Sequence, residues 1–517
     1  MQRKKDSIVS AKATNQRCNE AKGEVEGAES HELCPYFDNL PSHLAANILL
    51  QLPIKSLLVC RCVCKIWKTI ISEPRFAKLH FERSPFSLMI RTHRFNLVSR
   101  TLHLLDCQPE TYDFGSKNLV KLDCMTKLPL RDGKLFKEKR EKIKNKSMHP
   151  FHADTLFFNK YSLGIRDDRR WRYYADCRIS HDKFNIINSC NGLLCLSDPS
   201  TENPLAICNP VTGEFIRLPK ATKAPFKLNT NGVRMKGHSG LGFQPKTNEY
   251  KVIKMRIRHV ERAKEWVFER VILEVNTLGS PSWRNVEVDP RISILSLEYP
   301  TCVNGVFHWI KLDGQQRSIL CFCFESERLQ PFPSPPHVFE NHNNEIHDNR
   351  RISMGELKGF IYICDLNFSL VTMWVMNEYG IEESWTKAYN IETSFNSRSY
   401  SFSWRHGFCW PVKPFEEGAS IFLYHSHNCL IHCEPEKCEP EKYRRKVFQI
   451  RGACSALIDV IPHIPSLISL KDVVKGDNIE VLSIHSRYAE YKMSEENEVL
   501  FLAKWFTRDL VSKVETA

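Results

Sequence analysis

A two-residue turn signal recurs along most of this sequence, and its spacing constrains the fold more than any other feature. Short runs rich in Val, Ile, Leu, Phe and Tyr are joined at Asn191-Gly192, Asn304-Gly305, Lys358-Gly359 and Glu417-Gly418. Such a pattern is typical of antiparallel strands linked by tight turns. With one further member placed near Thr247-Asn248, the signals lie about 55 residues apart, close to the roughly 50 residues of a kelch-type propeller blade. The spacing therefore predicts a β-propeller of about six blades.

The clearest repeat unit is NSCNGLLCLSDPSTENPLAICNPVTGEFIRLP at residues 188–219. It reads as a turn at Asn191-Gly192, a strand, a loop, a strand, a turn at Asn209-Pro210 and a strand, and it ends at Leu218-Pro219. A weaker copy spans residues 302–333 and ends at Phe332-Pro333. A four-stranded blade cannot bury both of its faces alone, so the blades would stack around an axis and close a ring. A large two-sheet β-sandwich remains the alternative.

Residues 40–81 follow a helical pattern instead. Leu44, Ile48 and Leu52 are four residues apart, which places them on one helix face. Pro53 and Pro74 interrupt the pattern, since proline lacks an amide donor and disfavours helix at the preceding residue. We therefore expect about three short helices in a small domain at 36–82, ahead of the β domain at 86–472. Forty-odd residues make a small core, so this domain is expected to expose an apolar face to a partner.

Charge and cysteine content limit the class of protein without identifying it. The 517 residues carry a formal net charge of +13, which favours acidic partners but does not distinguish nucleic acid from an acidic protein surface. Residues 1–33 are polar and predict a disordered tail. The first residues have no apolar run behind their basic side chains, and no run of 18 apolar residues occurs, so we expect neither secretion nor a membrane span. The 20 cysteines are then expected to be reduced thiols of a protein of the cytoplasm and/or nucleus.

Three segments lie outside the repeat pattern. The basic segment KLFKEKREKIKNK at 134–146 is predicted to be a solvated loop between blades, with a nuclear-import or nucleic-acid patch as the alternative. The duplication CEPEKCEPEK at 433–442 is expected in another loop. In the C-terminal extension at 473–517, the stretch SEENEVLFLAKWF has an acidic start and an apolar continuation, which predicts a helix packed on the β domain.

The cysteines do not form a zinc-binding pattern. Cys60, Cys62 and Cys64 precede Trp67, but structural zinc sites need four convergent ligands, usually two closely spaced pairs. No second pair lies near, and His80 is the nearest downstream histidine. On one helix, Cys60 and Cys64 would share a face and Cys62 would point away. The same argument applies to two other pairs, Cys321 with Cys323 and Cys433 with Cys438.

Sequence signatures of catalysis are also missing. The chain has no His-Glu-x-x-His motif, no Gly-x-Ser-x-Gly elbow and no phosphate-binding loop that ends in Gly-Lys-Ser or Gly-Lys-Thr. His308 in VFHWI is predicted to be a strand residue packed beside Trp309, not a general base. We therefore expect no catalytic residues, no bound metal and no cofactor.

The helical segment resembles an F-box, and the β domain is similar to the F-box-associated domain common in plant proteins. The F-box matches are Leu40-Pro41, Ile48-Leu49, Leu52-Pro53, the run Lys55 to Leu58, the run Arg61 to Lys65, Trp67, and Pro74 with Phe76. At Cys60 the family more often has a larger aliphatic or aromatic residue. The β domain matches through NSCNGLLCL, NPVTGEFIRLP, GFQPKTNEYKVIK, VNGVFHWI and IPSLISLK, which are spread over residues 188–472.

This resemblance implies a non-catalytic substrate-recognition subunit of an SCF-type ubiquitin ligase. The F-box would bind a small acidic Skp-type adaptor, which links it to a cullin scaffold, and the β domain would bind a target protein. The adaptor-binding residues implied are Leu40, Pro41, Ile48, Leu52, Pro53, Leu57, Leu58, Val63 and Trp67. Lys55, Arg61 and Lys65 could face the adaptor's acidic surface.

We do not expect all of these adaptor contacts to be exposed to the same degree. We expect Leu40, Pro41 and Leu57 to be exposed, while core packing is an equally open reading for Ile48, Val63 and Trp67. A second function also stays open: a binding module outside ubiquitination, with nucleic acid held by the basic charge. Steep salt dependence of nucleic-acid affinity would favour that reading.

Overall fold

Four short helices open the described part of the computed structural model. They are α1 Ser42–Leu49, α2 Ile54–Cys60, α3 Lys65–Ser72 and α4 Pro74–Arg83. Pro41 and Pro53 directly precede α1 and α2, and Pro74 is the first residue of α4, where its missing N–H is not needed. The prediction of three helices was therefore one helix short, because Pro74 begins a helix instead of ending the helical segment.

The described residues cover the four helices above and the strands named below. They are 40–94, 97–98, 101–106, 119–122, 124–128, 184–198, 203–219, 233–262, 265–294, 296–313, 316–336, 338–339, 351–357, 359–367, 370–392, 409–411, 421–425, 429–435, 443–452, 458–475, 480–484 and 500–504. The predicted tail at 1–33 and the basic segment at 134–146 lie outside these residues. No helix within them is long and apolar enough to cross a membrane.

The described strands form six antiparallel sheets. Three consist of four consecutive strands each: β10 Val233–Gln244, β11 Glu249–Arg262, β12 Glu265–Thr277 and β13 Arg284–Val286; β14 Ser296–Val303, β15 Val306–Asp313, β16 Gln316–Cys323 and β17 Arg328–Phe332; β18 Arg351–Leu357, β19 Phe360–Asn367, β20 Leu370–Met376 and β21 Trp385–Glu392. A fourth sheet comprises β6 Asn185–Cys190, β7 Leu193–Ser197, β8 Pro204–Cys208, β9 Glu214–Arg217 and β27 Leu482–Ser483.

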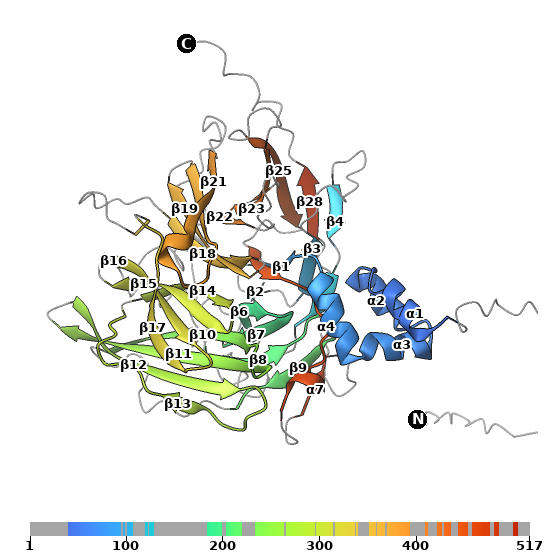
Figure 1. The fold of residues 1–517 in the computed structure, drawn as a ribbon, viewed down its shortest axis with the longest axis horizontal. Helices are drawn as coiled ribbons and strands as arrows, with labels where there is room; N and C mark the ends of the chain where they lie inside the picture. Colours follow the sequence, from blue (N-terminus) through green and yellow to red (C-terminus); the bar gives the residue numbers. More distant parts are fainter. Residues whose placement is uncertain are drawn as a thin grey trace, which may run out of the picture.

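The other two sheets combine strands from both ends of the chain. One joins β1 Ser87–Arg94, β2 Leu97–Val98, β3 Thr101–Asp106 and β5 Cys124–Lys127 with β26 Ile458–His463. The other joins β22 Cys409–Pro411, β23 Ile421–His425, β24 Cys429–Pro435 and β25 Tyr443–Gly452 with β28 Leu500–Lys504 and β4 Leu119–Leu122. The first strands of neighbouring sheets, β6, β10, β14 and β18, contact one another in sequence around the ring (Figure 1).

This arrangement is a β-propeller, as predicted, and the two-sheet sandwich is excluded. The six sheets agree with a repeat of about 55 residues. The helix predicted in the C-terminal extension is wrong, because residues 500–504 form strand β28 between β25 and β4. The duplication at 433–442 is not wholly a loop either, since its first three residues belong to β24.

Three predicted turns have the backbone conformation that their residues favour. Asn191, Asn248 and Asn304 have positive φ angles of 47°, 52° and 52°, a region that asparagine tolerates well. Each links the first and second strands of its sheet, so the repeat member placed near Thr247-Asn248 is confirmed. The signal at Glu417-Gly418 lies outside the described residues.

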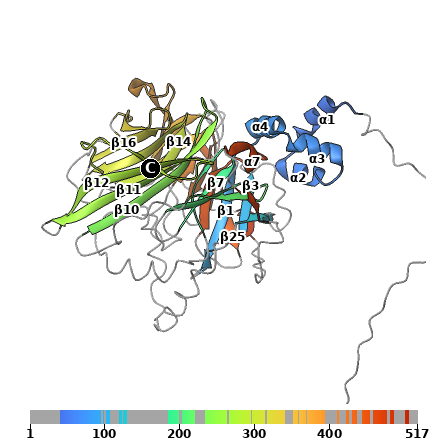
Figure 2. The same ribbon diagram turned by 90° about the horizontal axis from the view of Figure 1, so that it is seen from below.

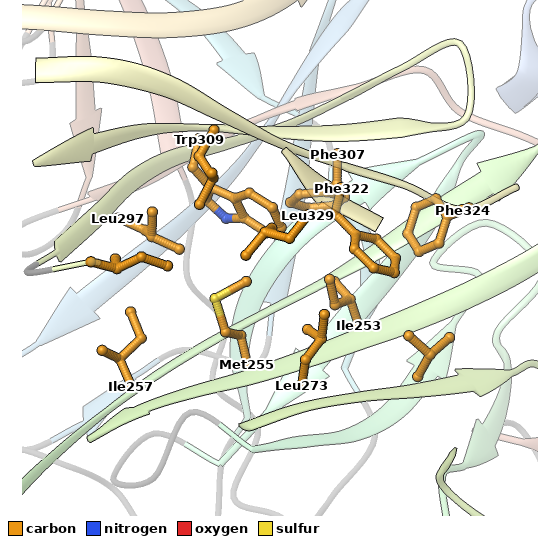
Figure 3. Packing of buried hydrophobic residues seen from close by; sticks show 13 residues of the cluster. Ile253, Met255, Ile257, Leu273, Leu297, Phe307, Trp309, Phe322, Phe324 and Leu329 are labelled. Carbon is orange, nitrogen blue, oxygen red and sulfur yellow. The ribbon is translucent and has the colours of Figure 1, made fainter. Parts of the chain in front are cut away.

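Hydrophobic side chains between neighbouring sheets form the core, and Figure 3 shows the cluster between β11–β12 and β14–β17. Phe307 and Trp309 of β15 are buried, with their ring centroids 4.8 Å apart. Gly240 of β10 faces this cluster, and a Cβ atom there would lie 2.1 Å from the ring of Phe307. The glycine therefore provides the space that the phenylalanine ring occupies.

The helical domain and the propeller share one hydrophobic cluster. Leu49, Ile71 and Phe76 of the helices pack with Val211, in the β8–β9 turn, and with Leu467. All five side chains are buried. Figures 1 and 2 both show α4 close to the strands, with α1–α3 extending away from the ring. The helical domain is therefore packed against the propeller and still presents much of its surface to solvent.

Candidate docking surface on the helical domain

Five large apolar side chains of the helical domain are exposed to solvent. They are Leu44 and Ile48 in α1, Val59 in α2, Val63 in the following turn, and Ile66 in α3. Ile48 is 54% exposed and Val63 62% exposed. Leu44 and Ile48 are one helical turn apart, so they share a face of α1, as their spacing predicted. We call these five residues the apolar surface.

Leu57, predicted to be exposed, lies in the core of the helical domain. Its side chain is 0% exposed and packs in the cluster that contains Leu49 and Ile71. The prediction was wrong for a simple reason: both faces of α2 carry leucine or valine, and the sequence does not show which face the other helices cover. Leu57 therefore stabilises the helical domain, and its side chain is not available for contact with a partner protein.

The other predicted contact residues divide between exposed and half-buried positions. Pro41 and Pro53 are exposed. Leu40, Leu52, Leu58 and Trp67 are half-buried and pack against the helical core. For Ile48 and Val63, where core packing was an open alternative, the structure places both side chains in solvent. Leu44, Val59 and Ile66 were not predicted as contacts, although Leu44 could have been found from its spacing to Ile48.

The three cysteines at 60–64 are not on one helix. Helix α2 ends at Cys60, and Cys64 precedes α3, where its Sγ accepts a hydrogen bond from the backbone N–H of Trp67 at 3.4 Å. The Sγ of Cys62 donates to the carbonyl of Leu58 at 3.7 Å. Cys60 is half-buried beside the helical core. Within the described ranges, no group of three His, Cys, Asp or Glu side chains is placed to hold a metal ion.

His80 fastens α4 to the connection between α1 and α2. Its Nε2–H donates to the carbonyl of Leu52 at 3.1 Å, and the Oγ of Ser84 lies 3.1 Å from its Nδ1. Burial lowers the pKa of His80, so the ring is neutral at physiological pH. His80, the histidine nearest to the cysteines in the downstream sequence, therefore fixes α4 to this connection.

The basic residues expected near the apolar surface differ in exposure. Lys65, beside Ile66, is exposed, whereas Lys55 and Arg61 are half-buried. The helical domain therefore offers an apolar surface with a positive charge at its edge. Such a surface suits a partner with apolar pockets and acidic residues around them.

Comparisons with known proteins agree with this division of the chain. A family model described as "F-box associated beta propeller domain" matches residues 149–407, which is half of the chain, and a model described as "F-box domain" matches residues 37–79. F-box protein At3g07870 of Arabidopsis thaliana is 24% identical over 376 residues, covering 69% of this chain and 73% of its own. F-box protein DOR, from the same plant, is 25% identical over 352 residues, covering 66% and 72%.

Solved structures share less with the chain. TolB from Acinetobacter baumannii covers 74% of this chain and 69% of its own, at 10% identity and a TM-score of 0.28. A similarity this low supports no conclusion about function.

Proposed function

Because this chain belongs to the family of F-box proteins with an F-box associated beta propeller domain, we propose that it is a substrate-recognition subunit of an SCF-type ubiquitin ligase. The F-box would bind a Skp-type adaptor, and through it a cullin scaffold, while the propeller binds a target protein. The chain would act without chemistry of its own, by raising the local concentration of target lysines beside a ubiquitin-loaded enzyme. We propose the cytoplasm and/or nucleus as its location.

The observation that carries this proposal is the apolar surface of the F-box. Its core is already filled, by Leu57 within the F-box and by Val211 and Leu467 from the propeller. The five exposed side chains are thus not needed to complete the fold, and exposed apolar groups gathered on so small a domain favour a protein partner. A helical partner could bury them between its own helices.

Co-purification with a Skp-type adaptor tests the proposal. The double variant Ile48→Asp and Val63→Asp should abolish adaptor binding, because two charges would be buried at the interface without partners. Both side chains are more than half exposed, so the free protein should keep its unfolding temperature. Val267→Asp is a matched control, since Val267 is 39% exposed and lies on β12 of the propeller. Adaptor binding that survives in the double variant would contradict the docking assignment.

The competing function, nucleic-acid binding, has no specific support from the described residues. It relied on the net charge of +13 and on the basic segment at 134–146, which lies outside them. We therefore keep the ligase subunit as the proposed function.

A further inference from the structure

The loop between β20 and β21 exposes apolar side chains at one end of the propeller. In the described residues outside the F-box, the exposed large apolar side chains are Val267, Phe360, Tyr379 and Ile381. Tyr379 and Ile381 belong to this loop, at residues 377–384. Phe360 begins β19, and the pairing of Tyr362 with Val375 places it opposite the start of the loop. Three of the four residues are thus on one sheet, at one end.

The loop is held in a defined conformation. The hydroxyl of Tyr379 donates to Nε2 of His308 at 2.8 Å, and its ring packs on Phe332 at 5.2 Å between centroids. Nδ1 of His308 lies 3.4 Å from the carbonyl of Thr301, which can only accept, so Nδ1 carries the proton. The Oγ of Ser384 is 2.8 and 2.7 Å from the carbonyls of Glu378 and Ile381.

A fixed loop that exposes apolar side chains has already met part of the entropic cost of binding. Side chains that are ordered before the encounter lose less freedom when a partner arrives, so they contribute more to affinity. Exposure of Ile381, at 47%, is not explained by packing within the chain. These features favour a recognition role for the loop over a merely connecting one.

Charge indicates what kind of partner fits. Glu378, Glu382 and Glu383 are exposed in the same loop, in a chain whose net charge is +13. The cation of Lys387, on the adjoining strand, lies over the ring of Trp374, 5.1 Å from its centroid. Three carboxylates around two apolar side chains would attract lysine or arginine and repel phosphate groups.

We propose that this loop surface, comprising Phe360, Glu378, Tyr379, Ile381, Glu382 and Glu383, binds a target-protein segment in which apolar side chains adjoin lysine or arginine. The inference deepens the proposed function, because it names the class of substrate. The β20–β21 and β8–β9 connections both link the third and fourth strands of their sheets, so they emerge at the same end of the propeller. The F-box packs on the β8–β9 turn. A bound segment would therefore lie on the end of the ring that carries the F-box.

Selection from a phage-displayed library of random 12-residue peptides, on the immobilised full chain without adaptor, tests this inference. The selected peptides should combine apolar residues with Lys or Arg. Their affinity should fall about tenfold in Ile381→Ser and in the double variant Glu382→Lys, Glu383→Lys, and should weaken with salt. The matched control Val267→Ser should bind them like the wild type. A library without enriched peptides, acidic peptides, or equal binding to Ile381→Ser would overturn the inference.

Adaptor binding separates this test from that of the proposed function. The F-box variant Ile48→Asp, Val63→Asp should still bind the selected peptides in the absence of adaptor, and Ile381→Ser should still co-purify with adaptor. If the wild-type chain binds the peptides but not the adaptor, only the ligase proposal fails. If it binds the adaptor but no peptide, only the substrate inference fails.

Discussion

At the scale of single residues, Asn209 joins parts of the chain that are far apart in sequence. Its Nδ2 donates to the carbonyls of Ser466 and Ile468 at 3.0 and 2.7 Å, and its Oδ1 accepts from the N–H of Val211 at 2.8 Å. The side chain is 0% exposed. Asn209→Ala should lower the free energy of unfolding by about 2–4 kcal/mol, because several buried backbone groups would lose their partners. Urea denaturation measures this change.

Asn390 provides the comparison for Asn209. It is exposed on β21, where its Oδ1 accepts from the hydroxyl of Thr372 at 3.0 Å. Asn390→Ala should change the stability by less than about 0.5 kcal/mol. If the two substitutions cost the same, the buried connection through Asn209 does not stabilise the fold.

Gly240 is constrained by the space it leaves. Gly240→Ala should destabilise the protein by about 1–3 kcal/mol, since the new Cβ would overlap the buried ring of Phe307. A double-mutant cycle with Phe307→Leu checks the cause. The double variant should lose less stability than the sum of the losses in the two single variants, because the leucine side chain removes the atoms that clash. Strict additivity would show that the cost of Gly240→Ala arises elsewhere.

How much could be predicted from the sequence differs among these residues. Spacing placed Leu44 and Ile48 on one face of a helix, which the structure confirms. Spacing did not show that Leu57 is buried while Val63 is exposed, because burial depends on how α3 and α4 pack. Asn209 was recognised as a turn residue, yet its partners at 466 and 468 follow only from tertiary contact.

At the scale of elements, the link between β15 and the β20–β21 loop should depend on pH. Burial lowers the pKa of His308 to about 4, whereas an unfolded histidine titrates near about 6.5. Its contribution to stability is complete above about pH 6.5 and is lost as pH falls toward 4, because the unfolded chain takes up the proton first. Between pH 7 and pH 5 the wild type should lose about 2 kcal/mol more than His308→Gln.

The comparison of the two pH values, and not the absolute stability, isolates the titration of His308. The variant also changes packing against Phe332, whose ring centroid is 4.6 Å from that of His308, but this cost is present at both pH values. An identical loss in His308→Gln would mean that His308 does not couple folding to pH.

Helices and strands were predictable where a periodic pattern extended over many residues, or where the residues between two runs favour a tight turn. The unit at 188–219 forms β6 to β9, with its turns where Asn191-Gly192 and Asn209-Pro210 indicated. The stretch SEENEVLFLAKWF was predicted as a helix from its acidic start and apolar continuation. A short apolar run does not distinguish the period of a helix from that of a strand. Pairing decided the outcome: Leu500 lies opposite Leu122 of β4 and Gly452 of β25.

At the scale of the whole molecule, the repeat spacing predicted a ring but not how the ring closes. The sheet of β1 and β3 also contains β26, more than 300 residues later in the chain, with Ile90 opposite Val460. Such long-range pairing has no local signal, because each strand looks like any other in the repeat. The ring is therefore complete only when both ends of the β domain have folded together.

This closure predicts cooperative unfolding. Val460 is 6% exposed and packs in a cluster with Leu88 and Phe448, which belong to two neighbouring sheets. Val460→Asp would bury an unpaired charge and should cost more than about 4 kcal/mol. Because each sheet is supported on both sides, we expect the entire β domain to unfold in one transition at a lower temperature, as followed by near-ultraviolet circular dichroism. Val267→Asp, on the exposed side of β12, should leave the transition unchanged. A partial loss of signal in Val460→Asp, with the remaining sheets still melting at the wild-type temperature, would show that the blades unfold independently.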